Sequence, residues 1–300
     1  PFASCVCEEF GATTQHPTPV IEATGSGGGL KLFSEGLGTN TPDITNTSRQ
    51  MKLSEYERCM QNGVEKIHEV IVGYDGISLC ENTANPGLNL TREELALAVA
   101  AKVPQDGKLV KNPYKYWDQI NSELPHREIL IYGPPTTSGT RDAFEELVME
   151  AATEEIPGYD RAYTSIRQDG VYVASGENDN LIVQRLNQDK AAMGIFGYSY
   201  LDNNRGKIQP VNIDGVEPTE DTISTGEYPV ARSLFFYVKL DHLDKVSGLK
   251  EYVDLFLGEM MIGGRGYLKR QGLIPMPKEM REQERKEWKN RELLQKSDLE

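Results

Sequence analysis

The chain has 300 residues, of which 38% are hydrophobic and 26% charged, a composition typical of a globular protein with one large or two medium domains. Its formal net charge of −14 argues against binding to nucleic acids or anionic membranes, because both need a basic surface. No apolar run approaches the roughly 18 residues of a membrane span. Any anion site in this chain would therefore be a local positive pocket.

The four cysteines, Cys5, Cys7, Cys59 and Cys80, form no C-x-x-C pair, and the histidines are few and scattered. We therefore expect no metal and no other cofactor. Buried free thiols are favoured, with a Cys59–Cys80 disulfide as the alternative. The chain begins PFASC without an initiator Met, as a processed or truncated N-terminus would.

The most informative stretch is GSGGGLKLFSE, residues 25–35. A helix over residues 2–10 and a short strand over 20–24 are expected before it. A glycine-rich turn that opens a helix exposes backbone N–H groups at the positive end of the helix dipole and so attracts anions. Ser26 adds a hydroxyl donor. The stretch could equally be a flexible surface loop.

Two nucleotide-binding patterns fail on this stretch. Leu30 occupies a position that must be glycine both in the phosphate loop G-x-x-x-x-G-K-[ST] and in the dinucleotide fingerprint G-x-G-x-x-G. The stretch therefore favours a small anion over a nucleotide.

A second group of polar side chains follows in TPDITNTSRQM. A short strand is expected over residues 43–46, and Thr47, Ser48 and Arg49 then precede a helix. Ser54 and Glu57 have the spacing of a capping box. Residues 69–80 are expected to form a buried strand that bends at GYDG, and the turn-rich residues 82–89 to mark a domain boundary.

The next part of the chain alternates helices and strands. Helices are expected over residues 90–103, with Thr91 and Glu94 as a capping box, and over 113–125. A strand over residues 128–135 then delivers TTSGT to the start of a helix over 141–152. Several hydroxyl groups, Gly139 and the guanidinium donors of Arg141 gather there. A helix cap needs only one Ser or Thr, so this group of residues indicates an additional role.

The remaining elements continue the alternation. We expect a polar turn over residues 176–180 that opens a helix, β structure over 191–201, a returning strand over 227–239, a helix over 249–261, and a charged, solvated helix in the tail. This alternation indicates an α/β protein with largely parallel sheets.

Six motifs carry a resemblance: GSGGGLKLF, ITNTSRQM, VGYDGISL, GPPTTSGTRDAF, AAMGIFGYSYL and YPVARSLFFYVK. In this order and spacing they resemble the periplasmic phosphate-binding proteins of bacterial phosphate ABC transporters, from Pro1 to about Met276. The resemblance implies the type II periplasmic-binding-protein fold, in which two α/β domains joined by a two-strand hinge hold the ligand in the cleft between them. Domain I would comprise residues 1–82 and 229–300, and domain II residues 83–228.

The resemblance also implies a function. The chain would be a periplasmic, monomeric solute-binding protein that delivers inorganic phosphate to a membrane permease, without enzymatic activity and without binding nucleic acid. The alternatives are a binding protein or sensor for another oxyanion, such as sulfate or molybdate, and a phosphoester hydrolase that uses Ser138. Against the hydrolase, the chain has no G-x-S-x-G motif and no metal cluster.

Ligand-binding residues follow from matching motifs. The family's first phosphate loop would lie just before Pro1, outside this sequence. The resemblance implies phosphate contacts by three groups of residues: Ser26, Gly27, Gly28 and Gly29; Ser48; and Ser138, Gly139 and Thr140.

Two positions depart from the family pattern. Arg49 stands where many members have an Asp that accepts the ligand's proton, and Pro134 stands where many have an Arg. We expect Arg49 and Arg141 to supply the positive charge. Asp75 in GYDG is the best candidate for the proton acceptor that separates hydrogen phosphate from sulfate, although it could equally cap its own turn.

Overall fold

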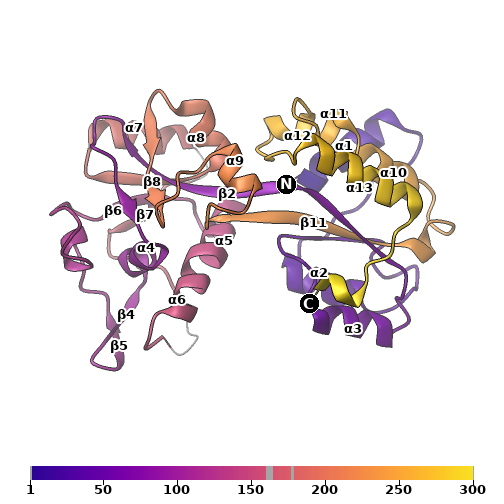
Figure 1. The fold of residues 1–300 in the computed structure, drawn as a ribbon, viewed down its shortest axis with the longest axis horizontal. Helices are drawn as coiled ribbons and strands as arrows, with labels where there is room; N and C mark the ends of the chain where they lie inside the picture. Colours follow the sequence, from indigo (N-terminus) through magenta and orange to yellow (C-terminus); the bar gives the residue numbers. More distant parts are fainter. Residues whose placement is uncertain (1, 160–164, 177–178, 300) are drawn as a thin grey trace. The chain divides into compact units, whose positions relative to one another are not determined.

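The computed structural model describes residues 2–159, 165–176 and 179–299. The chain divides into two compact units: unit 1 comprises Pro1–Asp75 and Arg232–Glu300, and unit 2 comprises Gly76–Ala231. The chain therefore passes between the units twice, on strands β2 (Ile67–Asn82) and β11 (Ala231–Lys239), which run side by side (Figure 1). Because β2 continues unbroken through its crossing, the turn at residues 82–89 ends a strand and does not coincide with the boundary between the units.

Unit 1 is built around β11 and the first part of β2. Strand β1 (Ile44–Thr47) pairs antiparallel with β11, with Ile44 opposite Val238. The helices of this unit are α1 (Phe2–Thr13), α2 (Gly25–Phe33), α3 (Leu53–Gln61), α10 (Leu249–Phe256), α11 (Glu259–Ile262), α12 (Tyr267–Arg270) and α13 (Lys278–Asn290), with 3-10 turns η3 (Leu240–His242) and η4 (Lys296–Leu299). One hydrophobic cluster joins α2, α3, β2, β11 and the C-terminal segment through Leu30, Phe33, Met51, Cys59, Val64, Ile67, Phe235, Tyr237 and Leu294.

Unit 2 contains a mixed sheet. Strand β6 (Leu130–Gly133) pairs parallel with β7 (Tyr172–Ala174) and β8 (Ala192–Gly197), whereas β2 pairs antiparallel with β8 and with β9 (Ile208–Pro210). The expectation of largely parallel sheets is therefore wrong. The small strands are β3 (Asn89–Leu90), β4 (Lys102–Gln105), β5 (Lys108–Lys111) and β10 (Asn212–Ile213). The helical elements are α4 (Arg92–Val99), η1 (Trp117–Gln119), α5 (Gly139–Phe144), η2 (Glu145–Glu150), α6 (Ala151–Glu155), α7 (Asp179–Gln188), α8 (Tyr198–Asn204) and α9 (Glu220–Ser224).

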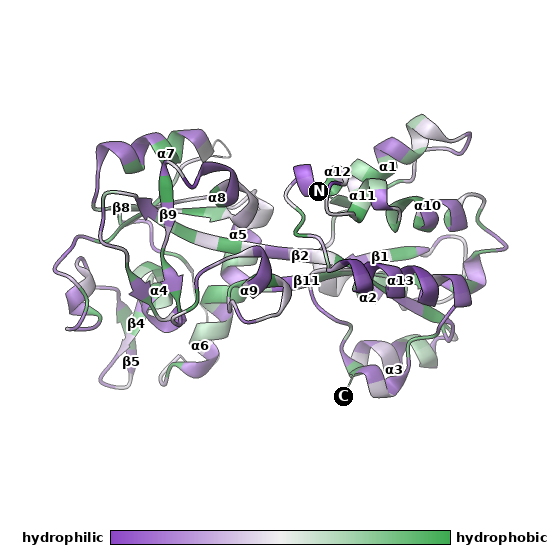
Figure 2. Cartoon of the chain, turned by 45° about the horizontal axis from the view of Figure 1, so that its top comes forward, coloured by the Kyte–Doolittle hydropathy of each residue, from purple (hydrophilic) through white to green (hydrophobic). Residues whose placement is uncertain are grey.

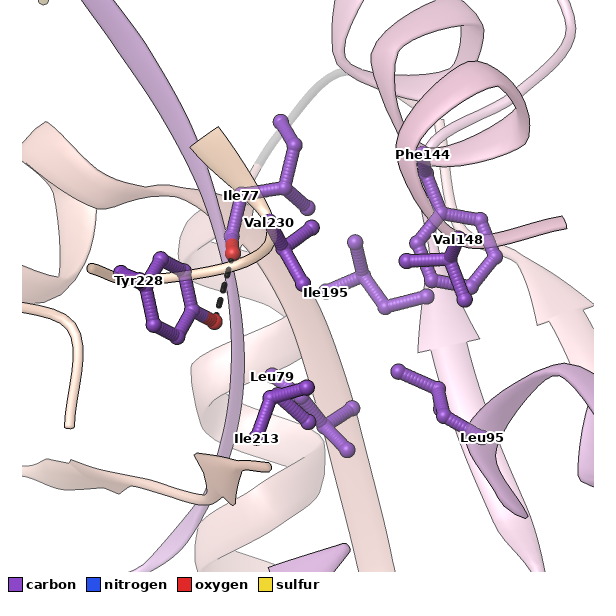
Figure 3. A pocket seen from close by; sticks show the side chains of 9 residues that line it. All are labelled: Ile77, Leu79, Leu95, Phe144, Val148, Ile195, Ile213, Tyr228 and Val230. Atoms are coloured by element: carbon purple, nitrogen blue, oxygen red, sulfur yellow. Dashed lines mark hydrogen bonds between the residues drawn. The ribbon is translucent and has the colours of Figure 1, made fainter. Parts of the chain in front are cut away.

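The centre of unit 2 is apolar and closely packed. Figure 3 shows the side chains around a narrow space between the sheet and the helices, which has no room for a water molecule. Tyr228 donates its hydroxyl proton to the carbonyl of Ile77 over 2.9 Å and so satisfies its polar atom within this core. This space is part of the packing and offers no ligand site.

Several local predictions need correction. Residues 20–24 form no strand, and Val20 is 91% exposed, because no neighbouring strand pairs with this segment after Pro17 and Pro19. Residues 113–125 form only the single turn η1. The helix predicted over residues 90–103 ends at Val99, and the following residues turn into the β4–β5 hairpin.

The helix caps give a mixed result. The Thr91–Glu94 capping box is confirmed, with the Glu94 N–H donating to Thr91 Oγ1 over 3.1 Å. The predicted Ser54–Glu57 box is wrong, because α3 is capped at Lys52, whose N–H donates to Glu55. The helix expected over residues 141–152 begins earlier, at Gly139, and passes through a π-helical segment. The polar turn expected over residues 176–180 lies partly outside the described residues.

The tail helix α13 is mostly hydrophilic (Figure 2), as the sequence predicts, but it is not simply solvated. Arg281, Glu284 and Trp288 are buried on one of its faces. Trp288 Nε1 donates to Asp254 of α10 over 2.7 Å, and this contact holds α13 to unit 1. Within the described part of the chain, no helix combines the length and apolar character needed to cross a bilayer.

All four cysteines are free thiols, so the disulfide alternative is wrong. Cys59 lies in unit 1 and Cys80 in unit 2, and neither is exposed to solvent. Burial raises the pKa of the Cys59 thiol to about 11 and also raises that of Cys80. Both thiols are therefore protonated and unreactive in the folded protein.

Candidate anion-binding site

The N-terminus of α2 is formed by the glycine-rich stretch itself. The helix begins at Gly25, whose φ of +69° falls in the left-handed region that favours glycine. A Cβ on Gly29 would lie 2.6 Å from Thr45 Oγ1, so glycine lets α2 pack closely on β1. The preceding residue, Thr24, makes no side-chain cap bond. Because the first N–H groups of a helix have no partner within it, they are donors for an anion.

The hydroxyls of Ser26 and Ser48 meet beside these donors. Their Oγ atoms are 3.1 Å apart, and the Ser48 N–H donates to Ser26 Oγ, also over 3.1 Å. Ser26 lies in the first turn of α2, and Ser48 immediately follows β1. The structure therefore brings two of the predicted loops together in unit 1. A side chain at Gly27 would meet no atom within 4 Å, whereas Gly28 lies against Thr24.

Arg49 faces a carboxylate of its own loop. Its Nη1 and Nη2 each donate to Glu55 over 2.8 Å, and Nη1 also donates to the Gln50 carbonyl. Burial alone would raise the pKa of Glu55, but the hydrogen bonds from Arg49 and Lys52 outweigh it and hold that pKa below its usual value. The guanidinium thus fastens the loop to α3. That Arg49 also supplies positive charge to the ligand stays a prediction.

Asp75 lies beside a cation that sequence reasoning missed. Arg232 Nη2 is 3.6 Å from Asp75 Oδ2, and both side chains are largely buried. Asp75 is on β2 and Arg232 on β11, at the two places where the chain passes between the units. The sequence did contain a signal for this ion pair. Two strands that both cross between domains must run close together, so charged residues at the crossings are candidates for a pair.

In unit 2, the predicted residues gather at the start of α5. Ser138 is the N-cap, and its Oγ accepts a hydrogen bond from the Thr140 N–H over 3.3 Å. A Cβ on Gly139 would meet no atom within 4 Å. Three successive small polar residues thus surround the positive end of this helical segment, which continues to Glu155.

Arg141 is buried beneath this helix start. Its Nε donates to Glu145, its Nη1 approaches the Pro134 carbonyl at 3.4 Å, and its guanidinium carbon lies 4.9 Å from the centre of the Tyr172 ring. Tyr172 in turn donates to the same Pro134 carbonyl over 2.8 Å. The positive charge is therefore held in a fixed position in unit 2.

Both units thus present small hydroxyl side chains at a helix N-terminus, a chemistry that suits an oxyanion. Among residues 2–159, 165–176 and 179–299, no group of three or more His, Cys, Asp or Glu side chains could hold a metal ion.

Comparison with known proteins gives a consistent picture. A family model described as the PBP superfamily domain matches residues 1–260. The chain is 30% identical to protein SphX of Synechococcus elongatus, over 92% of this chain and 74% of that protein. It is 26% identical to the phosphate-binding protein PstS of Staphylococcus saprophyticus, over 86% of this chain and 72% of that protein. A crystal structure described as a possible phosphate binding protein from Planctomyces limnophilus superposes with a TM-score of 0.79 at 28% identity, covering 97% of this chain and 95% of that one.

Proposed function

Because the chain belongs to the PBP superfamily, we propose that it is a solute-binding protein that captures inorganic phosphate and delivers it to the permease of an ABC transporter. Two relatives support the ligand by their names, the PstS protein and the Planctomyces limnophilus protein. Such a protein binds and releases its ligand and does no chemistry on it, so it needs no nucleophile and no general base.

One observation carries the proposal: the Ser26–Ser48 hydroxyl pair at the glycine-rich N-terminus of α2. Hydroxyls and backbone N–H groups are neutral donors, so they bind an oxyanion without the cost of burying further charges. Glycine leaves room for the anion to reach the backbone at Gly27.

We infer that Ser138, Gly139 and Thr140 of unit 2 supply the second set of contacts and that Arg141 balances the ligand's charge. In this proposal phosphate lies between the two units, β2 and β11 act as a hinge, and closure traps the ligand. Asp75, which lies beside Arg232, accepts a hydrogen bond from the protonated oxygen of hydrogen phosphate. The proposed setting is the periplasm, where the protein acts as a monomer.

A specific feature favours a second candidate, a binding protein for another oxyanion. Arg49 occupies the position, directly after Ser48, where many family members have an acidic residue. In this chain Arg49 forms a salt bridge with Glu55. If Asp75 does not act as an acceptor, the site consists of donors alone and would accept sulfate or molybdate as well.

Isothermal titration calorimetry of the ligand-free protein against phosphate, sulfate and molybdate tests the proposal. We expect phosphate to bind much more tightly than the other two anions at pH 6 and at pH 8. A variant carrying Ser26→Ala and Ser48→Ala should lose about 3–6 kcal/mol of phosphate binding, since each of the two hydrogen bonds to the charged anion contributes about 1.5–3 kcal/mol. Ser54→Ala, which removes an exposed serine from another helix of unit 1, is the matched control and should bind as the parent does. Absence of phosphate binding by the parent protein would refute the proposal.

A further inference from the structure

The loop that carries Ser48 is held from behind by two carboxylates. Glu55 binds Arg49 and the Lys52 N–H, as described above. The second carboxylate is Glu69 of β2, which receives the side-chain amide of Gln50 at 3.1 and 3.3 Å from its two oxygens. The loop between β1 and α3 is therefore anchored at Arg49, Gln50 and Lys52, directly after Ser48.

The contact with Glu69 continues through a buried tyrosine. Tyr237 of β11, which is fully buried, donates its hydroxyl proton to Glu69 Oε2 over 2.6 Å. The same hydroxyl accepts the N–H of Met51 over 2.6 Å. The Tyr237 hydroxyl therefore accepts from the Met51 backbone and donates to Glu69, and so links the loop to β2.

The donors to Glu69 are neutral, although the carboxylate is half-buried. Burial raises the pKa of Glu69, the hydrogen bonds from Tyr237 and Gln50 oppose that rise, and the nearby carboxylates Asp298 and Glu287 add to it. Burying a carboxylate against neutral partners lowers stability unless each lone pair is used. Glu69 thus contacts both the side chain of Gln50 in the loop and the tyrosine that holds the Met51 backbone.

We propose that Glu69 is a positioning residue for the ligand: through Tyr237 and Gln50 it fixes residues 48–51, so that the Ser48 hydroxyl is held against Ser26 before phosphate arrives. This inference rests on the proposed function and adds to it a residue that does not touch the anion. Preorganisation of this kind raises affinity because the loop need not be ordered upon binding.

The C-terminal segment completes the arrangement. The Gln50 amide also approaches the carbonyl of Asp298 in η4 at 3.3 Å. Leu294 donates its N–H to the Ile67 carbonyl over 2.8 Å and packs in the same hydrophobic cluster as Leu30 of α2 and Met51. The C-terminal segment therefore contacts both the loop that carries Ser48 and the hydrophobic cluster that includes α2, the helix of Ser26.

Tyr237→Phe tests the inference, because it removes one hydroxyl and leaves the ring in the core. Tyr228→Phe is the matched control: Tyr228 is equally buried and loses one hydrogen bond, to the Ile77 carbonyl in unit 2. Phosphate affinity is measured by calorimetry and the melting temperature without ligand by calorimetric scanning. We expect both variants to melt at a lower temperature. Only Tyr237→Phe should bind phosphate more weakly, by roughly tenfold if the loop then holds its binding conformation about a tenth of the time.

Glu69→Gln, which keeps one acceptor oxygen and replaces the other by a donor, should weaken phosphate binding in the same direction. Equal phosphate affinities for Tyr237→Phe, Tyr228→Phe and the parent would show that the network is only structural and would overturn the inference, while the proposed function would stand. A parent protein that binds no phosphate would instead refute the proposed function. The two failures are therefore distinguishable.

Discussion

At the scale of single residues, the contact between Asp75 and Arg232 has the clearest consequence for specificity. The Asp75 carboxylate, 3.6 Å from Arg232, can accept a hydrogen bond from a protonated ligand. Hydrogen phosphate carries such a proton at neutral pH, and sulfate does not. The pair thus provides a means of discriminating between two anions of the same shape.

We predict that Asp75→Asn weakens phosphate binding by about 1.5–3 kcal/mol, the range of a hydrogen bond to a charged group, and changes sulfate binding much less or improves it. Competition calorimetry with both anions at pH 7 measures the difference. Asp244→Asn, at an exposed position of unit 1, is the control for the loss of one negative charge. Equal losses for phosphate and sulfate would exclude Asp75 as the proton acceptor.

The residue scale also shows what could be read from the sequence of the site. The hydroxyl groups were predictable, because Ser26, Ser48 and Ser138 lie in small polar stretches at expected helix starts. The partners of the arginines were not. Arg49 faces Glu55 one turn into the next helix, and Asp75 faces Arg232 far along the chain. Ion pairs depend on tertiary distances, which spacing in the sequence does not encode.

At the scale of elements, α13 shows how a highly charged helix can be a structural part of a unit. Its buried Glu284 accepts the backbone N–H of Ile71 on β2 over 3.1 Å. Burial, together with the nearby carboxylates Glu287 and Glu69, raises the pKa of Glu284 to about 8. The helix is therefore docked on β2 through a carboxyl group that is protonated at neutral pH.

This docking predicts a pH dependence of stability. In the unfolded chain Glu284 ionises near its usual pKa of 4.5, and in the folded protein only near 8. The folded state then binds more protons between these values, so the contribution of Glu284 to the free energy of unfolding falls as the pH rises from about 4.5 to about 8 and is constant above. Glu284→Gln keeps an oxygen that accepts the Ile71 N–H but cannot ionise. The variant should therefore lack the decrease in the free energy of unfolding that Glu284 causes between pH 4.5 and about 8.

Urea unfolding of the parent and of Glu284→Gln at pH 5, 7 and 9 measures the effect. The variant should gain on the order of 2–4 kcal/mol relative to the parent between pH 5 and pH 9. The difference between the two proteins cancels other titrating groups, such as the buried Lys239, whose pKa burial lowers to about 8. Glu282→Gln, exposed on the same helix, is the control. A pH-independent difference would contradict the protonated docking of Glu284.

Elements were predictable from sequence where local signals agreed. The Thr91–Glu94 box marked the start of α4, and the apolar run of β2 marked a buried strand. Prediction failed where tertiary context decided. Residues 20–24 have strand-like composition but find no partner strand, and residues 113–125 have helical spacing between two prolines but form only one turn. The mixed sheet also depends on β2 running against β8, which no local pattern reveals.

At the scale of the whole molecule, each unit contains one fully buried thiol, Cys59 in unit 1 and Cys80 in unit 2. Each thiol reports the opening of its own unit, because a buried, protonated cysteine reacts only after local or global unfolding. The two positions can be read separately by mass spectrometry after a short pulse of thiol reagent.

We predict that phosphate protects both thiols against labelling in urea. A ligand that contacts both units stabilises both, by about 2.7 kcal/mol at a concentration of one hundred times its Kd. Pulse labelling across a urea series, with and without phosphate, should shift the midpoints of Cys59 and Cys80 together. Sulfate at the same concentration is the control. Protection of only one thiol would show that phosphate binds one unit alone.

The division of unit 1 into two chain segments has a consequence during synthesis on the ribosome. Strand β1 precedes unit 2 in the chain, but its partner β11 begins only at Ala231, where unit 2 ends. Leu294, which completes the hydrophobic cluster around Leu30 and Met51, comes later still. Unit 2 can therefore fold while the nascent chain is still tethered, whereas the first segment of unit 1 must wait with its apolar surface exposed. The apolar side chains of this segment, such as Leu30 and Met51, therefore stay uncovered until β11 and Leu294 have been made.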